Sequence, residues 1–177
     1  MQSFVRGVDQ FSEWLGRSIA WLTLALVVIT FVIVVMRYLF NIGSVAMQES
    51  LLYLHSLIFL MGTAYTLKHD GHVRVDIFYR PMSPQNKAWV DLLGTLLLLI
   101  PFCLFIFLIS WQYVASAWSY HEGSREAGGI DAVYILKSLL LVMPATLLLQ
   151  GLAQAMKSLL IITGQNNPSD DQPVGAP

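Results

Sequence analysis

Charged residues divide this chain into long uncharged and mostly apolar stretches. Four of them stand out, at residues 18–36, 50–67, 92–120 and 138–156. A helix needs about 20 mostly apolar residues to cross a hydrocarbon core about 30 Å thick. Inside lipid, each backbone amide must also find its hydrogen-bond partner within the protein, which favours helices over open strands. The pattern predicts an all-α membrane protein with four transmembrane helices.

Serine and proline residues indicate where the expected helices begin, bend and end. Ser83-Pro84 is typical of a helix start, with serine as the N-cap and proline in the first turn. Pro101 and Pro144 lie inside the third and fourth helices and are expected to kink them. Residues 164–177 hold three prolines and two aspartates, which predicts a disordered tail. We therefore expect one transmembrane domain over residues 1–163, with helices at about 18–40, 46–67, 84–120 and 131–162.

The distribution of lysine and arginine predicts the orientation. Seven of these residues fall on one side of the predicted membrane and three on the other. Because basic residues gather in cytoplasmic loops, both termini and the second loop are expected in the cytoplasm. The N-terminal residues lack the pattern of a cleavable signal peptide, so the first helix is expected to remain as an anchor. Loops 41–48 and 121–131 would then face outward.

Composition narrows the function classes. Only 12% of the residues are charged, whereas soluble domains carry about 25%. The net charge of −1 offers no basic surface for nucleic acid. Cys103 is the one cysteine, and the four histidines do not pair at matching depth, so no metal site and no cofactor is predicted. Serine, histidine and aspartate fall on opposite membrane faces, which argues against an enzyme.

The first two helices carry polar residues at seven-residue spacing, which is nearly two turns and places each set on one stripe. We expect these stripes to meet each other or a shared protein partner, with an ion pair between arginine and glutamate near the outer face. The alternative is that both charged side chains reach the headgroups independently. The residues are Thr23, Thr30 and Arg37 on the first helix and Glu49, Ser56 and Thr63 on the second.

Two further segments carry candidate contact residues. Gln150 and Gln154 share one face of the fourth helix, and glutamine amides in lipid need partners, so this face is expected to meet protein rather than line a conduction path. The loop 70–81 mixes apolar and basic residues and is expected to lie in the inner interface. A solvated loop is the alternative. The anchoring residues would be Arg74, Phe78, Arg80 and Trp89.

An ordered set of motifs resembles a known family. Arg37-Tyr38-Leu39-Phe40-Asn41 ends the first helix, Glu49 opens the second, and Phe59-Leu60-Met61-Gly62-Thr63-Ala64-Tyr65-Thr66-Leu67 and His72-Val73-Arg74-Val75-Asp76 follow. Their order and spacing resemble the small membrane (Q) subunit of tripartite ATP-independent periplasmic (TRAP) transporters, a DctQ-like small permease. One departure is that Ala46-Met47-Gln48 stands where members often carry an aromatic and a second acidic residue.

The resemblance implies a scaffold in the bacterial inner membrane. In this family a large permease subunit moves substrate with sodium, and a periplasmic substrate-binding protein delivers the substrate, usually a small organic acid. By similarity, Arg37 and Glu49 would stabilise the assembly, with Ser56, Thr63, Gln150 and Gln154 also expected at the subunit interface. Side and charge make Glu122, Arg125 and Glu126 candidates for contacting the binding protein.

Two other functions remain open at the level of sequence. One is a haem- or quinone-associated membrane anchor of a redox enzyme, and the other is an autonomous four-helix exporter. The three readings differ in whether the chain holds a cofactor, works alone, or works inside a larger complex.

Overall fold

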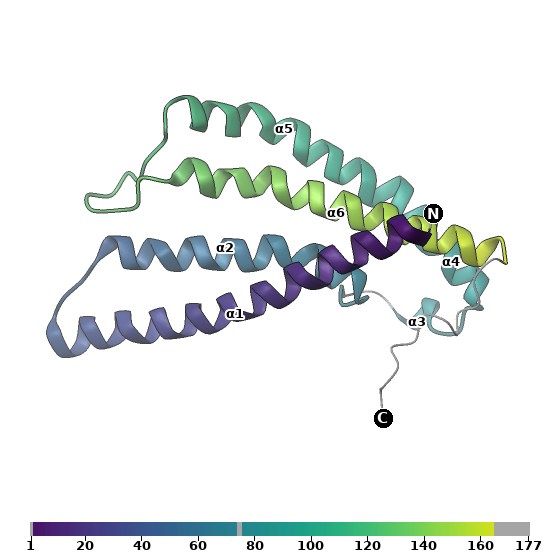
Figure 1. Cartoon of the computed structure of the whole chain (residues 1–177), viewed down its shortest axis with the longest axis horizontal. Helices are drawn as coiled ribbons and strands as arrows, with labels where there is room; N and C mark the ends of the chain where they lie inside the picture. Colours follow the sequence, from purple (N-terminus) through teal and green to yellow (C-terminus); the bar gives the residue numbers. More distant parts are fainter. Residues whose placement is uncertain (1, 74–75, 165–177) are drawn as a thin grey trace.

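The structure, a computed structural model, describes residues 2–73 and 76–164 and contains helices joined by loops within these ranges (Figure 1). The described residues include four helices that are long and apolar enough to cross a membrane. The prediction of an all-α membrane fold with four spanning helices is thus confirmed. The four are α1 (Gln2–Phe40), α2 (Val45–Lys68), the continuous helix Pro84–Ser119, and α6 (Val133–Ile162).

The continuous third spanning helix contains an irregular turn. It consists of α4 (Pro84–Gly94), a five-residue π-helical turn η1 (Thr95–Leu99), and α5 (Ile100–Ser119). Pro101 lies in the first turn of α5, two residues after the end of η1. Proline lacks the N–H that a regular helix would use there, so a local change of hydrogen-bond register is favoured beside it. The short helix α3 (Asp76–Tyr79) precedes α4.

Serine side chains fix the starts of two helices. The Ser44 hydroxyl accepts a hydrogen bond from the Met47 N–H at 3.4 Å and caps α2. The Ser83 hydroxyl accepts one from the Asn86 N–H at 3.3 Å and caps α4, with Pro84 in the first turn. Each cap satisfies one of the N–H groups that a helix start leaves without a partner.

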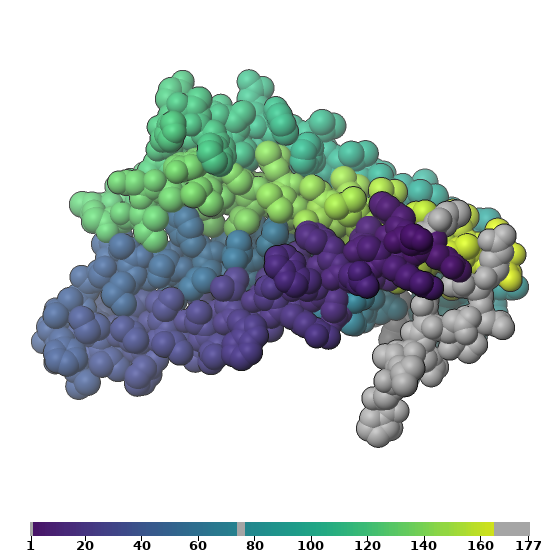
Figure 2. All heavy atoms as spheres, viewed as in Figure 1, coloured from purple at the N-terminus to yellow at the C-terminus, as the bar shows by residue number. Residues whose placement is uncertain are grey.

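The helices form a row rather than a closed bundle. α1 packs on α2, α2 on α6, and α6 on α5, so that α1 and α5 form opposite edges (Figure 1). The N-terminal part of α1 leaves its edge and crosses over α6, as Figure 2 also shows. Because α6 is flanked by α2, α4, α5 and this part of α1, it carries more buried residues than the other helices described.

Small side chains form much of the packed interior. Ala153 and Cys103 are fully buried, and Ala64 and Ala117 are nearly so. Small residues let helix backbones approach closely in a membrane, where lipid tails offer no hydrophobic driving force for association. Large apolar side chains point outward instead, including Phe31 at 67% exposure. The outer faces of the row are therefore apolar.

The first helix begins at Gln2, well before the uncharged stretch that starts at residue 18. Residues 2–17 contain charges, but two of them, Asp9 and Glu13, pair with residues of other helices rather than face lipid alone. The helix therefore continues into a segment that composition alone would place outside the membrane span. Among the other predicted features, Arg74 and the tail at 165–177 lie outside the described residues.

The two ends of the row differ in character. We call one the basic end; it holds the start of α1, the end of α2, α3, α4 and the end of α6, with Lys68, Lys87 and Lys157 among its residues. We call the other the loop end; it holds the α1–α2 loop and the loop 120–132 between α5 and α6 (Figure 1).

Candidate functional site

A carboxylate at the start of α2 organises the loop end. Glu49 accepts a hydrogen bond from the Ser124 hydroxyl through one oxygen and from the Ile130 N–H, at 2.6 Å, through the other. Both donors belong to the loop 120–132, so one side chain of α2 holds two points of a distant loop. Charge-assisted hydrogen bonds of this kind are shorter and stronger than neutral ones. We call Glu49, Ser124 and Ile130 the loop clamp.

Glycine is required beside the loop clamp. A Cβ atom at Gly129 would lie 2.3 Å from the Ser124 Oγ and 2.7 Å from a Glu49 carboxylate oxygen. Both distances are shorter than a Cβ contact can be, so a larger residue at this position would push the Glu49 carboxylate away from the Ile130 N–H. Gly128 has a φ of +79°, a left-handed conformation that glycine adopts without strain. The two glycines together let the loop close around Glu49.

A second set of contacts holds the beginning of the loop. The Lys137 ammonium lies 2.5 Å from a Glu122 carboxylate oxygen and 3.9 Å from the centre of the Tyr113 ring. The Trp118 indole N–H donates to the Ser138 hydroxyl at 2.8 Å. These contacts join α5, the loop and α6. The loop is therefore held at its start by Lys137 of α6 and further along by Glu49 of α2.

Two of the three predicted docking residues project from this fixed loop. Arg125 and Glu126 are exposed, whereas Glu122 is half-buried and paired with Lys137. Exposed charges on a preorganised backbone can recognise a charged partner at low entropic cost, because the loop is already ordered. The loop end thus presents two exposed charges on an ordered loop.

The other residues of the two predicted stripes do not bond across helices. Arg37 is exposed and makes no ion pair with Glu49 among the described residues; the loop clamp takes the carboxylate instead. Thr30 and Thr63 donate to carbonyls of their own helices, at 2.7 and 2.8 Å. Ser56 is half-buried. The predicted Arg37–Glu49 pair is therefore replaced by a contact that sequence spacing did not indicate.

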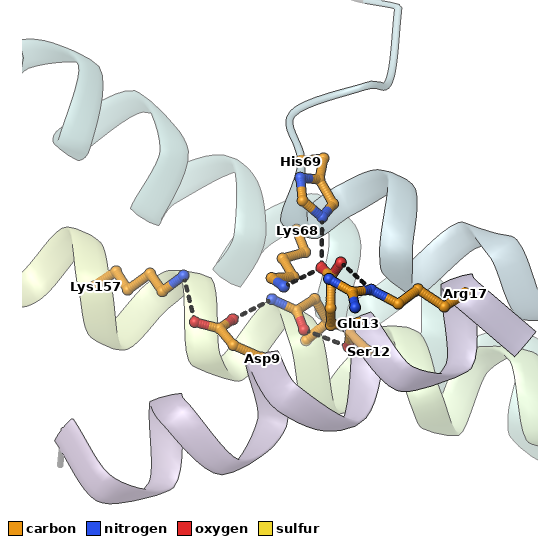
Figure 3. Close-up of polar contacts among 8 residues, drawn as sticks. Asp9, Ser12, Glu13, Arg17, Lys68, His69 and Lys157 are labelled. Atoms are coloured by element: carbon orange, nitrogen blue, oxygen red, sulfur yellow. Dashed lines mark hydrogen bonds and ion pairs between the residues drawn. The ribbon is translucent and has the colours of Figure 1, made fainter. Parts of the chain in front are cut away.

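The basic end contains a polar network that joins α1 to α6 (Figure 3). The Gln150 side chain is fully buried; its oxygen accepts from the Ser12 hydroxyl at 2.7 Å and its amide donates to Asp9 at 3.1 Å. Lys157 completes the network with an ion pair to Asp9 at 2.8 Å. Gln150 was expected to face a second subunit, and it faces α1 of its own chain instead. The N-terminal part of α1 covers it. Gln154, one turn further along α6, is half-buried.

A neighbouring cluster joins α1 to the end of α2. Glu13 pairs with Lys68 at 2.6 Å, with His69 at 3.0 Å and with Arg17 at 3.1 Å (Figure 3). Sequence reasoning missed both groups because it placed residues 2–17 before the first helix. In the structure, the buried residues Val5, Ser12 and Ile19 recur every seven positions, which is the spacing of one helix face.

The predicted interface residues lie at the basic end. Phe78 is 73% exposed on α3, Trp89 is 49% exposed on α4, and Arg80 is exposed between them. Among the described residues, no three of the histidine, cysteine, aspartate and glutamate side chains are grouped so as to hold a metal ion. His55 stacks on Phe59 with ring centres 6.3 Å apart.

Comparisons with known proteins agree with a four-helix membrane protein. No solved structure matches the chain. The chain is 26% identical, over 113 residues, to the C4-dicarboxylate TRAP transporter small permease protein DctQ of Vibrio cholerae. That match covers 63% of this chain and 48% of the relative, so the chain spans about half of the relative's length. The family model for the DctQ component of tripartite ATP-independent periplasmic transporters matches residues 26–160. This match covers most of the chain and reaches into all four spanning helices, and it does not favour the redox-anchor alternative. The chain therefore belongs to the DctQ family of TRAP transporter components.

Proposed function

We propose that this chain is the scaffold subunit of a TRAP transporter and that its loop end receives the periplasmic substrate-binding protein. The loop clamp is the observation that carries the proposal, because it orders the loop 120–132 around Glu49. An ordered loop with exposed Arg125 and Glu126 presents a fixed charge pattern to a partner. The chain would act by positioning the delivery protein over a second membrane subunit.

The apolar faces of the helix row support pairing with a large permease subunit. α1 and α5 form the edges of the row and expose large apolar residues such as Phe31 and Leu108. Arg37, Ser56 and Thr63 lie on α1 and α2 and are not used for bonds between these two helices. A second membrane protein would satisfy such polar positions more fully than lipid. We assign the face that α1 and α2 present, with these polar positions, to the large subunit.

Orientation and transport chemistry belong to the same proposal. The concentration of lysine and arginine at the basic end supports a cytoplasmic location for that end and for both termini in a bacterial inner membrane. Phe78, Arg80 and Trp89 would anchor it in the inner interface. The relative is named for C4-dicarboxylates, which supports uptake of a small organic acid through the large subunit. Sodium coupling of that uptake is part of the proposal because the family resemblance implies it.

Replacing Glu49 by glutamine tests the loop clamp directly. Glutamine keeps the size of the side chain but removes the charge and turns one acceptor into a donor, so it cannot accept from both Ser124 and Ile130. We expect faster hydrogen exchange at the Ile130 amide and slower uptake dependent on the binding protein, with the large subunit still co-purifying. Asp131→Asn is the matched control, because Asp131 is an exposed carboxylate on the same loop.

The outcomes separate the parts of the proposal. Unchanged loop exchange in Glu49→Gln would show that the carboxylate does not order the loop. Faster exchange with normal uptake would show that an ordered loop is not needed for delivery. Uptake by this chain alone in liposomes would overturn the scaffold role itself.

A further inference from the structure

A groove at the basic end is not used by the proposed docking function. It has a volume of about 680 Å³ and lies between the end of α2, α3, the α4–η1–α5 helix and α6. This volume falls in the range of about 300–1,000 Å³ that is typical of small-molecule sites. Most of its wall is apolar, and its polar residues include Asp70, Asp91 and Gln154.

The irregular turn shapes the wall of the groove. Gly94 lines it immediately before η1, and a Cβ there would meet no atom within 4 Å. Leu99, at the end of η1, packs closely over Gly151 of α6, where an added Cβ would lie 2.6 Å from a Leu99 methyl. The absence of a side chain at Gly94 leaves the hollow open, and Gly151 lets Leu99 of the groove wall pack close to α6. π-helical turns are found frequently at functional sites.

The apolar wall is open toward the side of the helix row. Leu98 is 72% exposed, Phe102 is 57% exposed and Val90 is 45% exposed, and all three line the groove. They belong to the third spanning helix, so the groove is accessible laterally from the surrounding lipid. A hydrocarbon chain could enter without passing through water.

The polar end of the groove carries acidic side chains. Asp91 accepts a hydrogen bond from the Tyr79 hydroxyl at 2.7 Å, and no lysine, arginine or histidine among the described residues pairs with it. Asp70 lines the same groove. A carboxylate beside an apolar wall favours a cationic partner, because its own desolvation is then offset. Positive charge lies close by, since the Lys87 ammonium is 5.4 Å from the centre of the Tyr79 ring.

We propose that this groove binds one phospholipid with a primary-amine headgroup, taken from the leaflet at the basic end. An acyl chain would lie along Leu98 and Phe102, the ammonium would meet Asp91, and the phosphate would lie toward Lys87. The order of charges in the site, acid and base at one end of an apolar channel, matches a zwitterionic lipid. An anionic lipid without the amine would leave Asp91 unpaired. The inference rests only on the chain being embedded in a membrane and does not depend on the transport role.

Native mass spectrometry of the full chain tests the site. The protein is reconstituted in vesicles of equal phosphatidylethanolamine and phosphatidylglycerol and then released in mild detergent. We expect retained lipid with a severalfold preference for phosphatidylethanolamine. Asp91→Asn, which keeps a group able to accept from Tyr79, should bring the ratio of the two lipids toward one. Equal retention of both lipids by the unmodified chain would overturn the headgroup assignment.

A second variant tests the groove itself. Gly94→Leu fills the hollow from its wall without a clash and should abolish lipid retention while the helical content is kept. Gly7→Leu is the matched control, because Gly7 is also a helical glycine with no atom within 4 Å of an added Cβ. Wild-type lipid retention by Gly94→Leu would refute the site.

Photo-crosslinking in intact membranes decides what fills the groove in the complex. A benzophenone amino acid replaces Leu98, at the open lip. A lipid adduct supports the proposal, whereas an adduct to the large permease subunit would overturn it and show a protein contact instead.

Discussion

Replacing Gln150 by leucine probes the polar network that holds α1 on α6. The side chain is fully buried and makes two hydrogen bonds, one with the Ser12 hydroxyl at 2.7 Å and one with the Asp9 carboxylate at 3.1 Å. Leucine fills a similar volume but can make neither bond. Asp9 keeps its ion pair with Lys157 at 2.8 Å. Ser12, which is 1% exposed, would be left without its partner and without access to water.

The expected loss of stability follows from the missing hydrogen bond to Asp9 and from the unpaired Ser12 hydroxyl. A hydrogen bond to a charged group contributes about 1.5–3 kcal/mol, and a buried polar group left unpaired costs about 1–3 kcal/mol. The apolar leucine regains part of this by burial. Interhelical hydrogen bonds in membrane proteins are also weaker, at about 0.6–2 kcal/mol. We expect Gln150→Leu to lower the free energy of unfolding by about 2–4 kcal/mol, taking the contributions together.

A double-mutant cycle is the decisive assay. Ser12→Ala alone should also destabilise the protein, because it leaves the Gln150 oxygen unpaired. In the double variant neither orphaned group remains, so the combined loss should fall short of the sum by about 1–2 kcal/mol. Unfolding in detergent micelles by titration with sodium dodecyl sulfate, followed by circular dichroism, gives the four free energies. Additive losses would refute the claim that Ser12 and Gln150 act as one unit.

Three further predictions follow from single contacts. Gly16→Ala should destabilise the protein by about 1–3 kcal/mol in the same unfolding assay, because its Cβ would lie 2.1 Å from the Tyr65 ring; a neutral result would show that the ring can move freely. Tyr53→Phe should be neutral or stabilising, because the buried Tyr53 hydroxyl has no partner among the described residues, and a measurable loss would reveal an unseen bond. Lys137→Met should release Glu122 and speed limited proteolysis within the loop 120–132; an unchanged cleavage rate would argue that this pair does not restrain the loop.

Much of the fold could be predicted from hydropathy, because lipid imposes a strong constraint. A segment such as 138–156 has few alternatives to a helix when each backbone amide must be satisfied without water. The same constraint does not apply to residues 2–17, whose charges are compatible with a solvated extension. Whether those residues continue as helix depended on partners in α2 and α6, which lie far away in the sequence.

The candidate site was less accessible from sequence. Seven-residue spacing predicts that Glu49, Ser56 and Thr63 share one stripe of α2, but it could not show what faces that stripe. Glu49 meets the loop 120–132, more than seventy positions away in the chain. The pattern that favoured Arg37 as its partner considered only the neighbouring helix. Contacts of this kind depend on the rotational orientation of α2 relative to α6, and hydropathy gives little information about that orientation.

The sequence alone determined that this chain spans a membrane with four helices and carries the motifs of its family, because helix formation in lipid depends on local composition. Tertiary structure decided which polar groups meet. It placed α1 across α6, enclosed Gln150, closed the loop on Glu49 and opened a groove beside η1. Those outcomes depend on the packing of whole helices, and packing is set by shape and by distant partners that no local pattern records.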